Sequence, residues 1–349
     1  MSDTVQYMRR CLQLAVKGIG FVAPNPMVGA VLVYQDRIIG EGWHKQFGGP
    51  HAEVSCLKNV LPEDRKYIPD STLYVSLEPC SHHGKTPPCT GLILEQGIRK
   101  VVIGCEDPFP FVHGKGISLL KEKGLEVEVG LLENECREVN HRFMTYHQKR
   151  RPYIVLKWAQ TADGFIGTGT SERLIISNNT TDRLVHKWRS EEAAILIGTN
   201  TASLDNPLLT ARWGNQPQPV RIILDRSLKL KKDLRIFNEG EGKAVILNDH
   251  MEQTGGRISY VKLSKTVSPA RAILDACYQA GIQSLLIEGG QKLIQSFIDE
   301  QLWDEVRVIT AMNKFGNSGT TAPKFENKAF PEMYFLQGDK IQIYHQKSD

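Results

Sequence analysis

The sequence has little net charge and no long basic or apolar run. Its formal charge is +4 over 349 residues, and its longest block of Lys and Arg is Lys149-Arg150-Arg151. Nucleic-acid-binding proteins usually concentrate basic side chains on one face, so this distribution argues against nucleic acid as a main partner. The apolar runs have the length of β-strands and are too short to span a bilayer, so we expect no membrane segment. A small anionic substrate remains compatible with the weakly positive charge.

Cysteines are few and scattered, and we expect no secretory signal. The seven cysteines are scattered along the chain, and Met1–Thr4 does not begin a charged segment followed by an apolar run. We therefore expect reduced thiols or metal ligands in a cytoplasmic protein, rather than a disulfide framework. No internal repeat is present. The sequence is compatible with a homo-oligomer.

The length and the 41% hydrophobic content suffice for two packed cores. Strand and helix patterns alternate, with strands expected at Thr72–Leu77 and again at Tyr153–Lys157, which predicts two α/β domains. The basic, polar stretch Tyr146–Pro152 is expected to be the junction. The predicted domains are residues 1–147 and 152–349. The expected helices lie at 4–17, 51–60, 91–96, 116–123, 180–190, 268–280 and 291–300.

A metal-binding pattern lies in the first half. His51-Ala52-Glu53 is expected to open a helix, Cys80 follows a strand and a proline, and Cys89 follows two prolines. This matches the His-x-Glu and Pro-Cys elements of zinc-dependent nucleobase deaminases. Three protein ligands leave the fourth zinc position open for water. We predict His51, Cys80 and Cys89 as the ligands, and Glu53, which points away from the ligand position of His51, as the proton carrier.

The loop between the two ligand cysteines holds eight residues, where the general signature has two. It adds His82, His83 and Lys85, which favours contacts to a substrate larger than a bare base, such as a phosphorylated sugar. Additional metal ligation by the histidines and a solvated Lys85 are the alternatives. Asn25 and His44 flank the first expected hairpin, and we favour substrate contact over a simple turn role for both.

The second half has a weaker pattern. Gly289-Gly290 follows an expected strand and precedes a helix, where backbone N–H groups can receive a phosphate. An ordinary turn explains the two glycines equally well. The G-x-G-x-x-G fingerprint is absent, so a Rossmann domain is not supported.

Four segments carry a family resemblance: Ala23–Gly29, Gly49–Glu53, Leu77–Cys89 and Asp107-Pro108. They resemble the bifunctional riboflavin-biosynthesis deaminase–reductases, over essentially the whole chain. The resemblance implies a cytidine-deaminase-like domain followed by a dihydrofolate-reductase-like domain. It also implies zinc-dependent deamination of 2,5-diamino-6-ribosylamino-4(3H)-pyrimidinone 5′-phosphate, and then reduction of the ribosyl to the ribityl side chain by NADPH.

The resemblance also implies site residues. The deaminase substrate would be bound by Asn25, His44, His82, Lys85 and Asp107. The reductase substrate would be bound by Lys157, Arg189, Leu209, Arg212 and Glu288, and NADPH by Ala159, Ile175, Ser177, Thr201, Asp205, Gly289 and Gly290. This chain departs from the family pattern at Phe109, where Asn is common, and at Arg173, where a small hydroxyl residue is common. It also departs at Ile175, which stands in place of an aromatic residue that contacts the cofactor.

Three other functions compete with the bifunctional enzyme. The C-terminal domain could be inactive or ligand-sensing beside a working deaminase. A tRNA-editing deaminase would share the zinc motif, but it would need a short inter-cysteine gap and a basic surface. A structural zinc domain would need a fourth protein ligand, which the motif does not supply.

Overall fold

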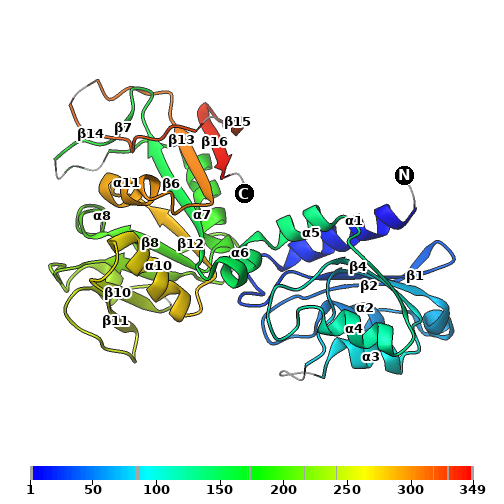
Figure 1. Cartoon of the computed structure of the whole chain (residues 1–349). Helices are drawn as coiled ribbons and strands as arrows, with labels where there is room; N and C mark the ends of the chain where they lie inside the picture. The colour runs from blue at the N-terminus through cyan, green and yellow to red at the C-terminus, as the bar shows by residue number, and fades with distance from the viewer. Residues whose placement is uncertain are drawn as a thin grey trace. The chain divides into compact units, whose positions relative to one another are not determined.

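The computed structural model describes residues 3–82, 87–170, 172, 174–215, 217–240, 242–316, 318–327 and 330–346. The chain forms two compact units, residues 1–150 and 151–349, and each has its own sheet and core (Figure 1). Within the described part, no helix is both long and apolar enough to cross a membrane.

The first unit is built on a five-stranded sheet with the order β2-β1-β3-β4-β5. The strands are β1 (Gly29–Tyr34), β2 (Arg37–Trp43), β3 (Thr72–Leu77), β4 (Lys100–Cys105) and β5 (Glu126–Val129). β1 runs antiparallel to β2 and β3, whereas β3, β4 and β5 are parallel. Side chains alternate between the two faces, so Ala30 and Leu32 enter one core cluster while Val31 and Val33 enter the other.

Helices cover both faces of this sheet. They are α1 (Asp3–Ala15), η1 (Val16–Gly18), α2 (Ala52–Lys58), η2 (Pro62–Asp70), α3 (Cys89–Glu95), α4 (Lys115–Glu122), α5 (Glu133–Val139) and α6 (His141–Lys149). Buried residues of α2, α3 and α4 share one core cluster, and those of α1, α5 and α6 share the other (Figure 1). The N-termini of α2 and α3, which carry two of the predicted zinc ligands, therefore belong to helices on the same face.

The second unit has a nine-stranded sheet with the order β11-β10-β9-β8-β12-β6-β13-β16-β15. The strands are β6 (Tyr153–Gln160), β8 (Ala194–Gly198), β9 (Val220–Leu224), β10 (Ala244–Asn248), β11 (Ile258–Lys262), β12 (Ser284–Glu288), β13 (Glu305–Thr310), β15 (Glu332–Leu336) and β16 (Asp339–His345). β16 runs antiparallel to both of its neighbours, β13 and β15, and all other pairs in this sheet are parallel. β7 (Phe165–Gly167) and β14 (Thr320–Thr321) form a separate antiparallel pair.

The helices of the second unit are α7 (Asn179–Glu191), α8 (Thr199–Asp205), α9 (Arg235–Asn238), α10 (Pro269–Gln279) and α11 (Gln291–Asp299). α10 and α11 pack on one face of the sheet, and α8 and α9 contribute to the core on the other. α7 packs its Val185 and Trp188 against Ile309 and Ile341. The parallel strands end at one edge, where ligands of α/β sheets usually bind.

The observed elements include all of the expected helices, and the structure adds others that were not expected, such as α5 and α8. The stretch expected to be a linker from Tyr146 onward is helical as far as Lys149, because α6 buries Phe143 and Met144 in the core of the first unit. The division between the units falls after Arg150.

Candidate active sites

The predicted zinc ligands meet at one point of the first unit. His51 is the N-cap of α2, Cys89 begins α3, and Cys80 follows β3. The His51 Nδ1 lies 3.6 Å from the Cys80 Sγ and 3.4 Å from the Cys89 Sγ, and the three ligand atoms all lie within 4.8 Å of one another. The Cys89 backbone N–H also donates to the Cys80 sulfur at 3.3 Å.

These distances fit zinc. A tetrahedral site with Zn–S near 2.3 Å and Zn–N near 2.1 Å implies a separation of about 3.6 Å between the nitrogen and each sulfur. The donor set of one imidazole and two thiols is that of the zinc deaminases. The hydrogen bond from the Cys89 thiol, helped by His51, lowers the pKa of Cys80 to about 4. Thiolate is the form that binds a metal.

Glu53 lies in the first turn of α2 and is only 4% exposed. It interacts with the Cys89 side chain, and burial together with the nearby Cys80 raises its pKa. The carboxyl group is therefore beside the ligand cluster without being part of it. That placement suits a group that takes a proton from water and delivers it to a leaving group.

Asn25 and His44 form a second polar pair beside the metal ligands. The Asn25 Nδ2 lies 3.0 Å from the His44 Nε2, and the His44 Nδ1 lies 2.9 Å from the Pro50 carbonyl oxygen. The His44 and His51 rings are edge-on, with centroids 5.4 Å apart. Burial lowers the pKa of His44, so its ring is neutral, with Nδ1 donating to Pro50 and Nε2 accepting from Asn25.

Asp107 follows β4 and is buried, and its carboxylate accepts from the Phe109 backbone N–H at 2.8 Å. Burial raises the pKa of Asp107 to about 7. The Phe109 ring lies 6.3 Å from the His82 ring and 5.1 Å from the His147 ring, measured between centroids. Phe109 thus packs in an aromatic cluster where the family often has an amide. Lys85 lies outside the described residues.

The sequence analysis missed Glu78, which anchors the segment after Asp107. Its buried carboxylate accepts from the backbone N–H groups of Asp107 and Gly114 on one oxygen, and of Gly116 and Ile117 on the other. Gly116 also lies so close to Pro79 that an added Cβ would be 2.1 Å from the Pro79 oxygen. The available signal was an acidic residue at the end of a buried strand, directly before Pro79-Cys80.

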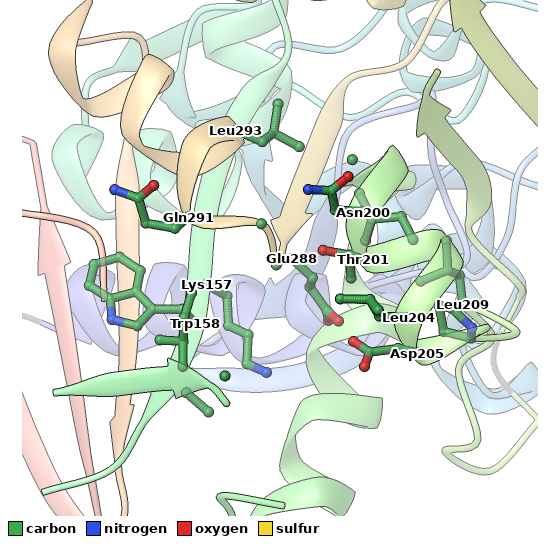
Figure 2. Close-up of a pocket in the computed structure, with 18 of the residues that line it drawn as sticks. Lys157, Trp158, Asn200, Thr201, Leu204, Asp205, Leu209, Glu288, Gln291 and Leu293 are labelled. Atoms are coloured by element: carbon green, nitrogen blue, oxygen red, sulfur yellow. The ribbon is translucent and has the colours of Figure 1, made fainter. Parts of the chain in front are cut away.

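In the second unit, the structure brings every residue predicted for the reductase site to one cavity of about 1020 Å³. It lies at the carboxyl ends of the parallel strands, and Figure 2 shows Lys157, Glu288 and Asp205 directed toward the same space from β6, β12 and α8. The predicted residues on its wall are Lys157, Ala159, Ile175, Ser177, Arg189, Thr201, Asp205, Leu209, Arg212, Glu288, Gly289 and Gly290. Ile175 is 79% exposed, and Arg173 lies outside the described residues.

A charged cluster lies on the wall of this cavity. The Arg189 guanidinium binds both oxygens of Glu288, at 2.9 and 2.5 Å. Burial opposes ionisation of Glu288, but the charges of Arg189 and Lys157 overcome it and lower the pKa of the carboxyl group to about 2. Burial lowers the pKa of Lys157. The sequence analysis named Arg189 among the residues that bind the reductase substrate, and in the structure its guanidinium is paired with Glu288.

The glycine turn fits a phosphate-binding role. Gly289 and Gly290 both have a φ of +78°, and they lead into α11. A Cβ on Gly289 would lie 3.0 Å from the Thr201 Cγ2, so a side chain would fill the space between the turn and α8. Glycine leaves the backbone N–H groups accessible at the N-terminus of the helix, where anions bind.

Two further features shape the wall. Leu209 is buried yet has a φ of +54°, an unfavourable backbone conformation for leucine that often accompanies functional sites. His186, which the sequence analysis missed, contacts Arg212 and Thr210. The signal was helical spacing, since His186 lies three residues before Arg189 on α7.

Comparisons with known proteins cover both units. The cytidine and deoxycytidylate deaminase zinc-binding region matches residues 1–105, and the RibD C-terminal domain matches residues 152–340. The riboflavin biosynthesis protein RibD of Aquifex aeolicus is 39% identical over 315 residues, covering 89% of this chain and 87% of the relative. RibD of Escherichia coli K12 is 37% identical over 352 residues, covering 95% of each.

Solved structures agree with these sequence matches. The diaminohydroxyphosphoribosylaminopyrimidine deaminase/5-amino-6-(5-phosphoribosylamino)uracil reductase of Thermotoga maritima has a TM-score of 0.85 and 36% identity, covering 98% of each chain. A RibD structure from Acinetobacter baumannii has a TM-score of 0.88 and 29% identity, covering 99% of each chain. The resemblance found in the sequence motifs is confirmed. This chain belongs to the RibD family, the bifunctional deaminase–reductases of riboflavin biosynthesis.

Proposed function

We propose that residues 1–147 carry out the deamination and residues 152–349 the reduction, on a phosphorylated pyrimidine. Zinc and NADPH are the cofactors of the two reactions. The observation that carries the first assignment is the separation of the His51 Nδ1 from the two cysteine sulfurs, 3.6 and 3.4 Å, which matches a tetrahedral zinc site. The charged cavity of the second unit supports the second assignment.

In the deaminase site, His51, Cys80 and Cys89 would hold zinc, which would supply Lewis-acid activation of a water molecule. Glu53 takes a proton from that water and delivers it to the amino group that leaves as ammonia. The water oxygen becomes the carbonyl oxygen of the pyrimidine product.

Around these residues, Asn25, His44, His82, Lys85 and Asp107 bind the substrate. The neutral His44 ring orients the Asn25 amide, because its Nε2 accepts from the amide nitrogen. That contact leaves the Asn25 carbonyl oxygen to accept from the substrate. Phe109 contributes an apolar contact where the family often has an amide.

The reductase cavity would hold NADPH, which would supply a hydride for reduction of the sugar at C1′. Ala159, Ile175, Ser177, Thr201 and Asp205 line the cofactor side of the cavity, together with the glycine turn. The turn's N–H groups at the start of α11 would receive a phosphate of the cofactor.

Lys157, Glu288 and Leu209 contact the sugar part of the substrate, and Arg189 keeps Glu288 ionised. Arg212 is exposed on the cavity wall, and it binds the substrate phosphate. The buried ion pair of Arg189 with Glu288 favours Arg212 over Arg189 for that role.

Two variants test the assignment by affecting one reaction each. Cys89→Ser removes a zinc ligand, so bound zinc measured by atomic absorption and ammonia release should both fall, while reduction of the deaminated substrate continues. Arg212→Ala should impair reduction and leave ammonia release unchanged. If either variant lost both activities equally in a folded protein, the division of labour between the two units would be wrong.

A further inference from the structure

His186 lies between Arg212, the Thr210 carbonyl group and Arg189 in the reductase site. It lies on α7, is 9% exposed, and lines the cavity together with Arg189. Its Nε2 lies 2.8 Å from the Arg212 Nη2, and its Nδ1 lies 3.1 Å from the Thr210 carbonyl oxygen. The same carbonyl oxygen also accepts from the Arg189 Nη1 at 3.4 Å.

These contacts define the protonation state of the ring. A guanidinium group only donates hydrogen bonds, so the His186 Nε2 must accept from Arg212 and carries no proton. The Nδ1 then carries the proton and donates to the Thr210 oxygen, which only accepts. The Arg212 backbone nitrogen also lies 3.2 Å from this Nδ1. The 2.8 Å contact between Nε2 and the Arg212 guanidinium nevertheless fixes the tautomer, because a guanidinium group has no acceptor atom.

We propose that His186 is a positioning residue of the reductase. In its neutral form, with the proton on Nδ1, it holds the Arg212 guanidinium on the cavity wall in the orientation that binds the substrate phosphate. The inference rests on the proposed function of the second unit, and it adds a residue that acts through Arg212. The exposed Arg212 side chain would otherwise have to be ordered by the substrate itself, at a cost in conformational entropy.

The charges around the ring favour the neutral form. Burial lowers the pKa of His186, and the cations Arg189 and Arg212 lower it further, against the weaker opposing effect of Glu288. Lys157 and Asp182 are the other charged groups of this cluster. Protonation on acidification would place an N–H group against the Arg212 guanidinium and break the 2.8 Å contact.

The test compares two variants of the full-length, zinc-loaded protein. His186→Leu removes the acceptor, whereas His186→Gln keeps an acceptor oxygen near the position of Nε2 but cannot titrate. Reduction is followed by NADPH absorbance, with the deaminated substrate carrying or lacking its 5′-phosphate. Loss of one charge-assisted hydrogen bond predicts that His186→Leu raises KM for the phosphorylated substrate about tenfold. The kcat, the KM for NADPH and ammonia release should not change.

The pH profile separates positioning from a purely structural role. The wild-type KM for the phosphorylated substrate should rise as the pH falls below neutrality, since burial and the neighbouring cations lower the pKa of His186 and the ring becomes charged only in acid. The substrate phosphate titrates in the same range, with a pKa near 6, so His186→Gln is the reference. That variant should have a near-wild-type KM at pH 8 and a shallower rise.

Two results would overturn the inference. One is an equal effect of His186→Leu on the substrates with and without phosphate. The other is identical pH profiles for the wild type and His186→Gln. The control is Arg212→Ala: if it leaves KM for the phosphorylated substrate unchanged, the proposed phosphate site itself fails. If Arg212→Ala raises this KM and His186→Leu does not, only the positioning role of His186 fails.

Discussion

Replacing Glu78 with glutamine tests how the deaminase site is held in place. The carboxylate accepts hydrogen bonds from four backbone N–H groups, two on each oxygen. A glutamine amide keeps one acceptor oxygen and turns its NH₂ group toward the other two donors, whichever way it is oriented. Two hydrogen bonds to a charged group are therefore lost, worth about 1.5–3 kcal/mol each. Removing the buried charge offsets part of this loss, so we expect a destabilisation of about 3 kcal/mol.

For a unit of this size, about 3 kcal/mol corresponds to a fall in melting temperature of about 6–12 °C. The assay is thermal inactivation of ammonia release, with reductase activity in the same sample as the internal reference. Hydrogen exchange should accelerate in residues 107–117, where the lost donors lie. The control is Glu126→Gln, which removes a largely exposed pair with Lys100 and should cost at most about 1 kcal/mol. If Glu78→Gln inactivates at the same temperature as this control, the anchoring role is refuted.

Three further predictions concern single steps. Glu53→Gln should lower the kcat of deamination by about 10²–10⁴-fold while zinc remains bound, because the side chain is outside the ligand cluster; retained activity would exclude it as the proton carrier. Gly289→Ala should raise KM for NADPH, since its Cβ would approach the Thr201 Cγ2 to 3.0 Å at a φ of +78°; an unchanged value would place the cofactor phosphates elsewhere. Chelation of zinc should stop ammonia release and spare reduction of the deaminated substrate, and a parallel loss of both would contradict two independent sites.

Local sequence patterns were enough to predict an element or a site residue where its role depends on the residues next to it in the sequence. The strand β3 has the expected bounds, because an apolar run of that length fits a sheet covered on both faces. The zinc cluster was predictable for a related reason. The spacing of His51, Cys80 and Cys89 places all three at helix starts and a strand end, and the structure brings them together.

Other features depend on contacts that the pattern does not encode. β15 has mostly exposed side chains and is defined by pairing with β16, through a turn in which Gln337 and Gly338 both have positive φ. The sequence analysis did not predict α6, because its three buried residues, Phe143, Met144 and Thr145, precede a polar and basic C-terminal end. His186 is a single histidine in a helix, and its importance depends on Arg212, which is distant in sequence and brought next to it only by the fold.

The most direct test of the account is a coupled assay on the purified protein with the diaminopyrimidinone ribotide, recording ammonia release and NADPH consumption together. The account predicts that ammonia appears first and that NADPH is then consumed, with one NADPH oxidised per ammonia released. Ammonia release without NADPH consumption would contradict the reductase assignment of the second unit. NADPH consumption with no ammonia released would contradict the zinc site at His51, Cys80 and Cys89.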